Sequence, residues 1–179
     1  MRSFSDIQAV QEMNLLVSFC DIKGFFGFCQ GQSHLEITKF LDEFYELVGD
    51  IVEEANGQVL KFLGDAALII FAEADVNRGV VALKTLQEQS DAWLKAGNTP
   101  CRNIVKAHFG PVGCGPVGTR HNKQFDIFGM TVNTAAKIPS YGLAITPQVF
   151  RQLDPDTRQL FKKHTPPVRY IPVDEAHQD

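Results

Sequence analysis

The sequence lacks the cysteine and histidine patterns from which zinc sites and nucleophilic triads are usually built. No two of its four cysteines have CxxC spacing, and no paired histidines lie near them; they are Cys20, Cys29, Cys101 and Cys114. A structural zinc site is therefore not expected, and we predict that all four are buried free thiols. The five histidines are just as scattered, which gives no support to a histidine-based metal site.

Long apolar runs and an excess of basic charge are also missing. No apolar run approaches the roughly 20 residues needed to cross a bilayer, and the N-terminal segment has no signal-peptide core. The net charge of −4 argues against a surface that coats nucleic acid, because phosphate binding draws on clustered Lys and Arg. We expect a soluble, cytoplasmic chain with no nucleic-acid partner and no membrane contact. Any phosphate ligand must then be met locally, with metal.

What is present suits one globular domain. The 179 residues are 44% hydrophobic and 21% charged, without repeats or low-complexity segments. This length and composition are enough for a substantial core. We expect residues 1–12 to form a linker or the end of a helix, and residues 13–179 to form the domain.

The spacing of apolar residues predicts an α+β fold. Apolar residues that recur at intervals of three and four, with capping signals at the ends of each segment, predict the helices. Short apolar runs between turn residues predict the strands. The expected helices are 35–54, 75–96, 131–137 and 147–152, and the expected strands are 14–21, 59–63, 66–71, 103–110, 124–129, 143–145 and 168–173. This order implies a ferredoxin-like, mostly antiparallel sheet with helices packed mainly on one face.

Two aspartates stand at the ends of predicted strands. Gly64 and Asp65 separate two apolar runs, which predicts a tight hairpin with a carboxylate at its tip. Asp21 ends the first strand, directly before a turn-rich stretch that begins at Gly24. If these strands are neighbours in the sheet, the two carboxylates can share divalent metal ions.

A glycine-rich stretch raises the question of a phosphate-binding loop. Four glycines fall between residues 110 and 118. Their spacing is not G-x-x-x-x-G-K-[ST], and no basic residue follows in register. A closely packed glycine-rich hairpin is the favoured interpretation.

Taken in order, four segments resemble the class III nucleotidyl cyclases, the catalytic domain of adenylate and guanylate cyclases. The segments are Asp21 with its Gly-Phe turn, Lys61–Asp65, the glycine-rich stretch, and the run from Phe125 to Asn133. The resemblance covers about Leu15 to Thr146 and implies the cyclase catalytic fold. It also implies a reaction in which the 3′-hydroxyl of a nucleoside triphosphate attacks its own α-phosphorus and expels pyrophosphate.

The resemblance implies a metal site. Asp21 and Asp65 match the family's metal-binding pair, and the backbone carbonyl of Ile22 matches the position that completes one coordination sphere. Two ions per site, Mg²⁺ or Mn²⁺, are expected to activate the hydroxyl and neutralise the triphosphate. The alternative for each aspartate is structural, because Gly-Asp is a common hairpin turn and Asp is a common cap after a strand.

Nucleotide recognition is expected from Lys61 and Asp126. In the family's adenylate cyclases these positions hold Lys and Asp, which recognise the adenine edge, whereas guanylate cyclases typically have Glu and a small or thiol residue. The resemblance therefore implies ATP as substrate, and the alternative is a salt bridge between exposed strand ends. Phe25 and Phe26, in the Gly-Phe turn, are expected near the triphosphate.

The expected catalytic residues are Asn133 and Lys137. Asn133 matches the asparagine that positions the ribose. Lys137 stands where the family has an arginine that stabilises charge on the α-phosphate; lysine keeps the charge but loses the planar fork. Two further departures are Phe26, where a threonine is frequent, and a shortened 138–142 segment in which Pro139 is expected to end the helix early.

These departures leave two functions open. One is a slow adenylate cyclase that makes cyclic AMP. The other is a catalytically impaired cyclase-homology domain that binds nucleotide or a partner without turnover.

The family works as head-to-tail dimers, in which the metal aspartates of one chain face the base-recognition and transition-state residues of the other. All of these positions occur in this chain, so the resemblance implies a homodimer with two equivalent sites. In that arrangement one hairpin serves both sites, because Asp65 holds metal in one and Lys61 contacts the base in the other.

Overall fold

Eight strands form one sheet in the computed structural model, which describes residues 4–177. The strands are β1 (Gln11–Lys23), β2 (Gln58–Leu63), β3 (Ala66–Ala72), β4 (Arg102–Gly118), β5 (Lys123–Phe128), β6 (Leu143–Ile145), β7 (Phe161–His164) and β8 (Arg169–Pro172). Their order is β2-β3-β1-β4-β6-β8-β7, and β5 pairs with β4 off this path. The pairing of β4 with β6 is parallel and the others are antiparallel, which confirms the prediction of a mostly antiparallel α+β sheet.

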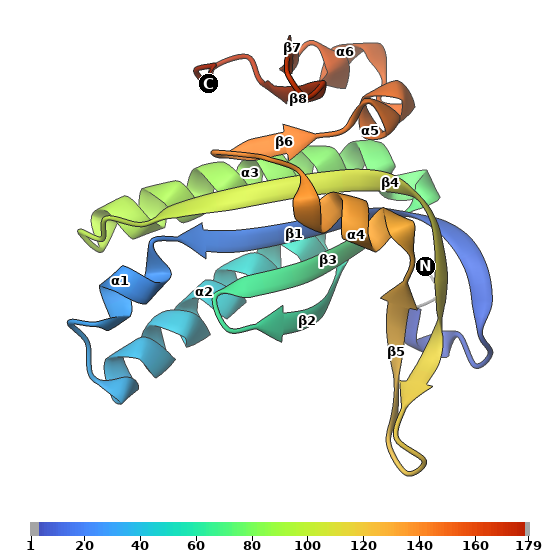
Figure 1. Cartoon of the computed structure of the whole chain (residues 1–179), viewed down its shortest axis with the longest axis horizontal. Coiled ribbons are helices and arrows are strands. Elements are labelled where there is room, and N and C mark those ends of the chain that lie inside the picture. Colours follow the sequence, from blue (N-terminus) through green and yellow to red (C-terminus); the bar gives the residue numbers. More distant parts are fainter. Residues whose placement is uncertain (1–3, 178–179) are drawn as a thin grey trace.

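Two long helices cover one face of this sheet (Figure 1). The helices are α1 (Phe25–Cys29), α2 (His34–Glu54), α3 (Val76–Ala96), α4 (Met130–Lys137), α5 (Pro147–Gln152) and α6 (Pro155–Arg158), with short 3-10 helices at Phe4–Asp6 and Glu73–Asp75. Helices α2 and α3 pack on the main core, and α4 lies on the opposite face. The expectation of helices mainly on one face is therefore confirmed.

Strand β1 shows why both faces are covered. Leu16 and Cys20 belong to the core beneath α2 and α3, whereas Leu15 and Val17 belong to the second core beside α4. Because successive strand residues point to opposite faces, this unbroken apolar run must be buried on both sides. The strand therefore lies in the interior of the sheet, between β3 and β4.

Local signals set the ends of α2. Ser33 and Glu36 form a reciprocal capping box at its start. At its end Asn56 adopts φ 62°, and the backbone N–H of Gly57 donates to the carbonyl of Val52 over 2.8 Å. A left-handed residue at this position closes the helix and directs the chain into β2.

The glycine-rich stretch belongs to a hairpin, as predicted, but it lies in the first strand of that hairpin and not in its turn. Its glycines lie within β4, which continues to Gly118, bends away from the sheet and pairs with β5 (Figure 1). The turn itself falls at 119–122. A Cβ added at Gly115 would lie 2.8 Å from the Cα of Val10, so glycine is required there by the close approach of the N-terminal segment.

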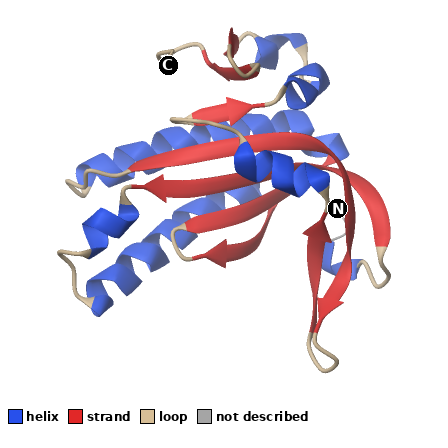
Figure 2. Ribbon diagram, viewed as in Figure 1, coloured by secondary structure: helices blue, strands red, loops and turns tan. Residues whose placement is uncertain are grey.

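The two ends of the chain add structure that the sequence did not predict. After residue 152, where only one strand is predicted, the chain forms α6 and the β7–β8 pair (Figure 2). Of the predicted N-terminal linker, residues 1–3 lie outside the described part; Phe4 stacks on Phe125 with ring centroids 5.8 Å apart, and Gln11 and Glu12 already belong to β1.

All four cysteines are free thiols. Cys20 and Cys114 are buried, as predicted, and burial raises the pKa of Cys20 to about 12. Cys29 and Cys101 are only half-buried, which corrects the prediction for these two. Between residues 4 and 177, no helix is both long enough and apolar enough to span a membrane.

Candidate active site

The candidate site residues gather on the face of the sheet that carries α4. Phe19 of β1 and Lys61 of β2 both pair with Leu68 of β3, which belongs to the core beside α4. Asp21 follows Phe19 by two residues and so points to the same face. Asn133 and Lys137 lie on α4 itself. Residues that are far apart in the sequence thus share one surface.

The hairpin places the two aspartates that are expected to bind metal beside each other. Asp21 pairs with Ala66, and the backbone N–H of Ile22 donates to the carbonyl of Asp65 over 3.3 Å. Burial raises the pKa of Asp65; its own backbone N–H lowers it, and the charge of Asp21 and a side-chain hydrogen bond with Asp21 raise it further. The two carboxylates are therefore close enough to repel when both are ionised.

This pair fits a divalent cation. Among residues 4–177 there is no group of three or more His, Cys, Asp or Glu side chains that could hold a metal. Mg²⁺ does not need one, because it is usually bound through one or two carboxylates together with substrate phosphates and water. Burial is the main cause of the raised pKa of Asp65, and a cation between Asp21 and Asp65 would also relieve the repulsion from Asp21 that adds to it.

Tyr45 of α2 supports the hairpin tip and was missed by the sequence analysis. Its hydroxyl donates to the carbonyl of Gly64 over 2.6 Å, and its ring stacks on Phe62 with centroids 3.7 Å apart. Gly64 adopts φ 66°, which favours glycine. The sequence does contain a signal for this contact. It is a tyrosine beside the apolar stripe of a helix expected to cover the sheet, where the tyrosine hydroxyl needs a hydrogen-bond partner on the sheet.

Lys61 and Asp126 form an ion pair across the same face. Lys61 Nζ lies 2.5 Å from Asp126 Oδ2, and the side chains are 37% and 18% exposed. The backbone N–H of Ile127 donates to the other carboxylate oxygen over 2.8 Å, which orients it. The pair joins β2 to β5, two strands that are not neighbours in the sheet. The structure thus brings together the two residues expected to recognise the base.

Helix α4 presents Asn133 and Lys137 on its outer surface. Both residues are exposed and lie one helical turn apart, whereas Ala135 between them is buried. The helix is anchored at its start, where the Thr131 hydroxyl donates to the carbonyl of Pro111 over 2.6 Å. It ends at Lys137, before Pro139, as predicted.

The Gly-Phe turn forms the short helix α1. Gly24 precedes it with φ 93°. The Phe25 ring packs against Phe40, with centroids 5.8 Å apart, and Phe26 is 81% exposed. The Phe25 side chain is thus packed against the core, whereas the Phe26 side chain is exposed to solvent.

The fold is similar to that of solved cyclase structures. The chain superposes on the crystal structure of the adenylyl cyclase CyaB from P. aeruginosa with a TM-score of 0.81 and 17% identity, covering 94% of this chain and 97% of that one. The fold is thus that of the class III nucleotidyl cyclases. The family model of the adenylate and guanylate cyclase catalytic domain matches residues 7–165, and the chain belongs to this family.

Relatives of both nucleotide specificities are similar to the chain. An adenylate cyclase of Anabaena cylindrica is 26% identical over 162 residues, which cover 83% of this chain and 32% of that protein. The guanylate cyclase soluble subunit alpha-1 of Canis lupus familiaris is 26% identical over 156 residues, which cover 82% of this chain and 22% of that protein. The chain thus matches about a third or less of these relatives. Because both relatives are equally identical to this chain, overall similarity does not distinguish ATP from GTP. The preferred nucleotide must be inferred from the residues of the site.

Proposed function

We propose that this domain is an adenylate cyclase, which converts ATP to 3′,5′-cyclic AMP and pyrophosphate at the interface of a head-to-tail homodimer. The proposal depends chiefly on the contact between Lys61 and Asp126. An ammonium that donates beside a carboxylate that accepts is complementary to adenine, which offers a ring-nitrogen acceptor next to an amino donor.

The other residues have distinct parts in the reaction. The 3′-oxygen forms a bond to the α-phosphorus while the bond from phosphorus to the leaving pyrophosphate oxygen breaks, and the hydroxyl proton passes to water. Asn133 orients the ribose, and Lys137 places positive charge beside the α-phosphate oxygens, where charge builds up. Asp21, Asp65 and the Ile22 carbonyl would hold two Mg²⁺ or Mn²⁺ ions. When bound, these ions lower the pKa of the hydroxyl and neutralise the triphosphate.

The exposed position of α4 supports a dimer. Asn133 and Lys137 face outward, and beside them Phe128 and Met130 are 55% and 74% exposed. Apolar side chains that gather beside functional residues are typical of a surface that another chain covers. A second copy would bring its aspartate pair to this surface.

The decisive experiment measures cyclic nucleotide formation. Purified protein, shown to be folded and dimeric, is incubated with Mn²⁺ and either ATP or GTP. We expect cyclic AMP from ATP, and a loss of at least about a hundredfold in Asp65→Asn, because metal ions contribute several kcal/mol to such reactions. Absence of product from both nucleotides would contradict the proposal, and unchanged turnover in Asp65→Asn would contradict the metal assignment.

The impaired-domain alternative is favoured by Lys137 itself, which replaces the planar guanidinium. Lys137→Arg distinguishes the two functions. A slow enzyme should gain several-fold in kcat, because two oxygens can then be contacted at once. A domain that binds nucleotide but shows no turnover in either form would support the alternative.

A further inference from the structure

The loop at 138–142 determines where α4 ends, and the C-terminal segment holds this loop. Ile138 is 7% exposed and packs with Ala144 and with Ile171 of β8. The carbonyl of Gly142 accepts from the backbone N–H of Val105 over 2.8 Å. Because α4 has eight residues and Lys137 is its last, the position of Lys137 depends on these contacts.

Glu175 lies directly against this loop. A Cβ added at Gly142 would lie 2.6 Å from Glu175 Oε2, and the backbone of Leu143 forms a hydrogen bond with the Glu175 carboxylate. Glu175 Oε1 is 3.8 Å from Arg102 Nη2, and the Glu175 side chain is 10% exposed. Burial raises the pKa of Glu175, whereas Arg102 and Leu143 lower it. The carboxylate is therefore a buried acceptor between the loop and β4.

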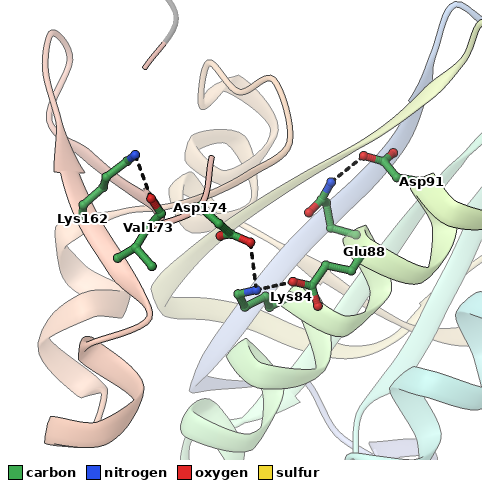
Figure 3. Close-up of polar contacts among 7 residues, drawn as sticks. Lys84, Glu88, Asp91, Lys162, Val173 and Asp174 are labelled. Atoms are coloured by element: carbon green, nitrogen blue, oxygen red, sulfur yellow. Dashed lines mark hydrogen bonds and ion pairs between the residues drawn. The ribbon is translucent and has the colours of Figure 1, made fainter. Parts of the chain in front are cut away.

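The preceding residue, Asp174, points elsewhere. Figure 3 shows its carboxylate beside Lys84 of α3, which also contacts Glu88, and the Asp174 side chain is 66% exposed. The distance from Lys84 Nζ to Asp174 Oδ2 is 3.7 Å. Lys162 donates to the carbonyl of Val173 over 3.0 Å and holds the backbone on the β7 side. The two adjacent carboxylates thus contact different parts of the fold. Asp174 contacts α3, and Glu175 contacts the loop.

We infer that Glu175 is a positioning residue, which fixes the 138–142 loop and thereby the end of α4 that presents Lys137. This role rests on the proposed cyclase function. Removal of the carboxylate leaves the Leu143 N–H and Arg102 without this acceptor, and a buried donor that loses its partner is costly. The loop then shifts, and Lys137 with it. Such a shift slows the chemical step more than it weakens ATP binding, which Lys61 and Asp126 supply from other elements.

The test compares Glu175→Ala, Glu175→Gln and the matched control Asp174→Ala. Glu175→Ala should lower kcat about tenfold and change KM less than about twofold, because misplaced groups mainly affect the transition state. Glu175→Gln keeps an acceptor for Leu143 and should recover part of kcat, and Asp174→Ala should behave like the unmodified protein. Hydrogen exchange of residues 130–142 should be faster in Glu175→Ala, faster to a smaller extent in Glu175→Gln, and unchanged in Asp174→Ala.

Exchange separates this inference from the proposed function, because it needs no turnover. If the unmodified protein makes no cyclic nucleotide, faster exchange confined to 130–142 still supports the link from Glu175 to α4, and unchanged exchange overturns it. In an active enzyme, faster exchange with unchanged kcat, or equal losses in Glu175→Ala and Asp174→Ala, overturns the positioning role. Circular dichroism identifies any variant that fails to fold, and Glu175→Gln then carries the test.

Discussion

Lys61 and Asp126 are 65 positions apart in the sequence, yet their side chains meet. Partly exposed ion pairs typically contribute about 0–1 kcal/mol to stability, because water and salt screen them. An ion pair that joins the edge strand β2 to β5 therefore adds little to the stability of the fold. Recognition of a ligand explains the pair better, as in the base-recognition role that we propose.

Replacing Lys61 and Asp126 by residues typical of guanylate cyclases should change which nucleotide the protein prefers. We expect Lys61→Glu combined with Asp126→Cys to shift the kcat/KM ratio from ATP towards GTP by about a hundredfold, because unmatched buried polar groups discriminate strongly between substrates. The measurement is cyclic AMP and cyclic GTP formation over a range of substrate concentrations. Lys61→Gln is the control, which should lose ATP activity without gaining GTP activity. A double variant that still prefers ATP would remove the base-recognition role.

The raised pKa of Asp65 makes stability depend on pH. The folded protein holds this proton more tightly than the unfolded chain does, so stability falls as pH rises from the usual value of 3.8 through the folded pKa. At neutral pH and without divalent metal, Asp65→Asn should therefore raise the melting temperature, an effect that excess Mg²⁺ should reduce by stabilising only the unmodified protein. Thermal unfolding at pH 4 and pH 7 checks this, and the advantage of Asp65→Asn should shrink at pH 4. A lower melting temperature of Asp65→Asn at pH 7 would contradict it.

At the scale of elements, the long helices follow from the sequence more closely than the short ones do. The predicted ranges 35–54 and 75–96 differ by one residue from α2 and α3, because a long apolar stripe and its caps are local signals. Helix α1 is five residues long, too short for a periodic pattern. The glycines of β4 favour a turn locally, but pairing with β1 and β5 holds that stretch extended.

Two helix-interior glycines should respond in opposite ways to replacement by alanine. Nothing lies within 4 Å of a Cβ added at Gly49 of α2, so Gly49→Ala should stabilise the protein by about 1 kcal/mol through helix propensity. A Cβ at Gly79 of α3 would lie 2.7 Å from Phe71, a fully buried ring. Gly79→Ala should therefore destabilise by about 1–3 kcal/mol. Urea unfolding measures the change in the free energy of unfolding for both variants. A change of the same sign in both would contradict this prediction.

At the scale of the whole molecule, the residues of both proposed half-sites lie on one chain. Asp21 and Asp65 lie at strand ends, and Asn133 and Lys137 face outward from α4. A head-to-tail dimer would place each half opposite its complement. Its two sites are then equivalent, and each depends on residues from both chains.

Mixing two inactive variants tests this arrangement. Asp65→Asn and Asn133→Ala damage different halves, so a heterodimer of the two contains one fully damaged site and one intact site. An equal mixture should regain about a quarter of the unmodified activity, because half of the dimers are mixed and each has one working site. Activity is measured after the subunits have exchanged. If both halves came from the same chain, the mixture would stay inactive.

The sequence by itself determined the classes of element and supplied the candidate residues of the proposed site. Asp21, Asp65, Lys61, Asp126, Asn133 and Lys137 were all identified from local motifs and their order. Only the tertiary structure decided which of them meet and what supports them. The contact of Lys61 with Asp126, the Tyr45 hydroxyl at the hairpin tip and Glu175 against the 138–142 loop join distant segments. Such contacts depend on strand order and register, which local spacing does not encode.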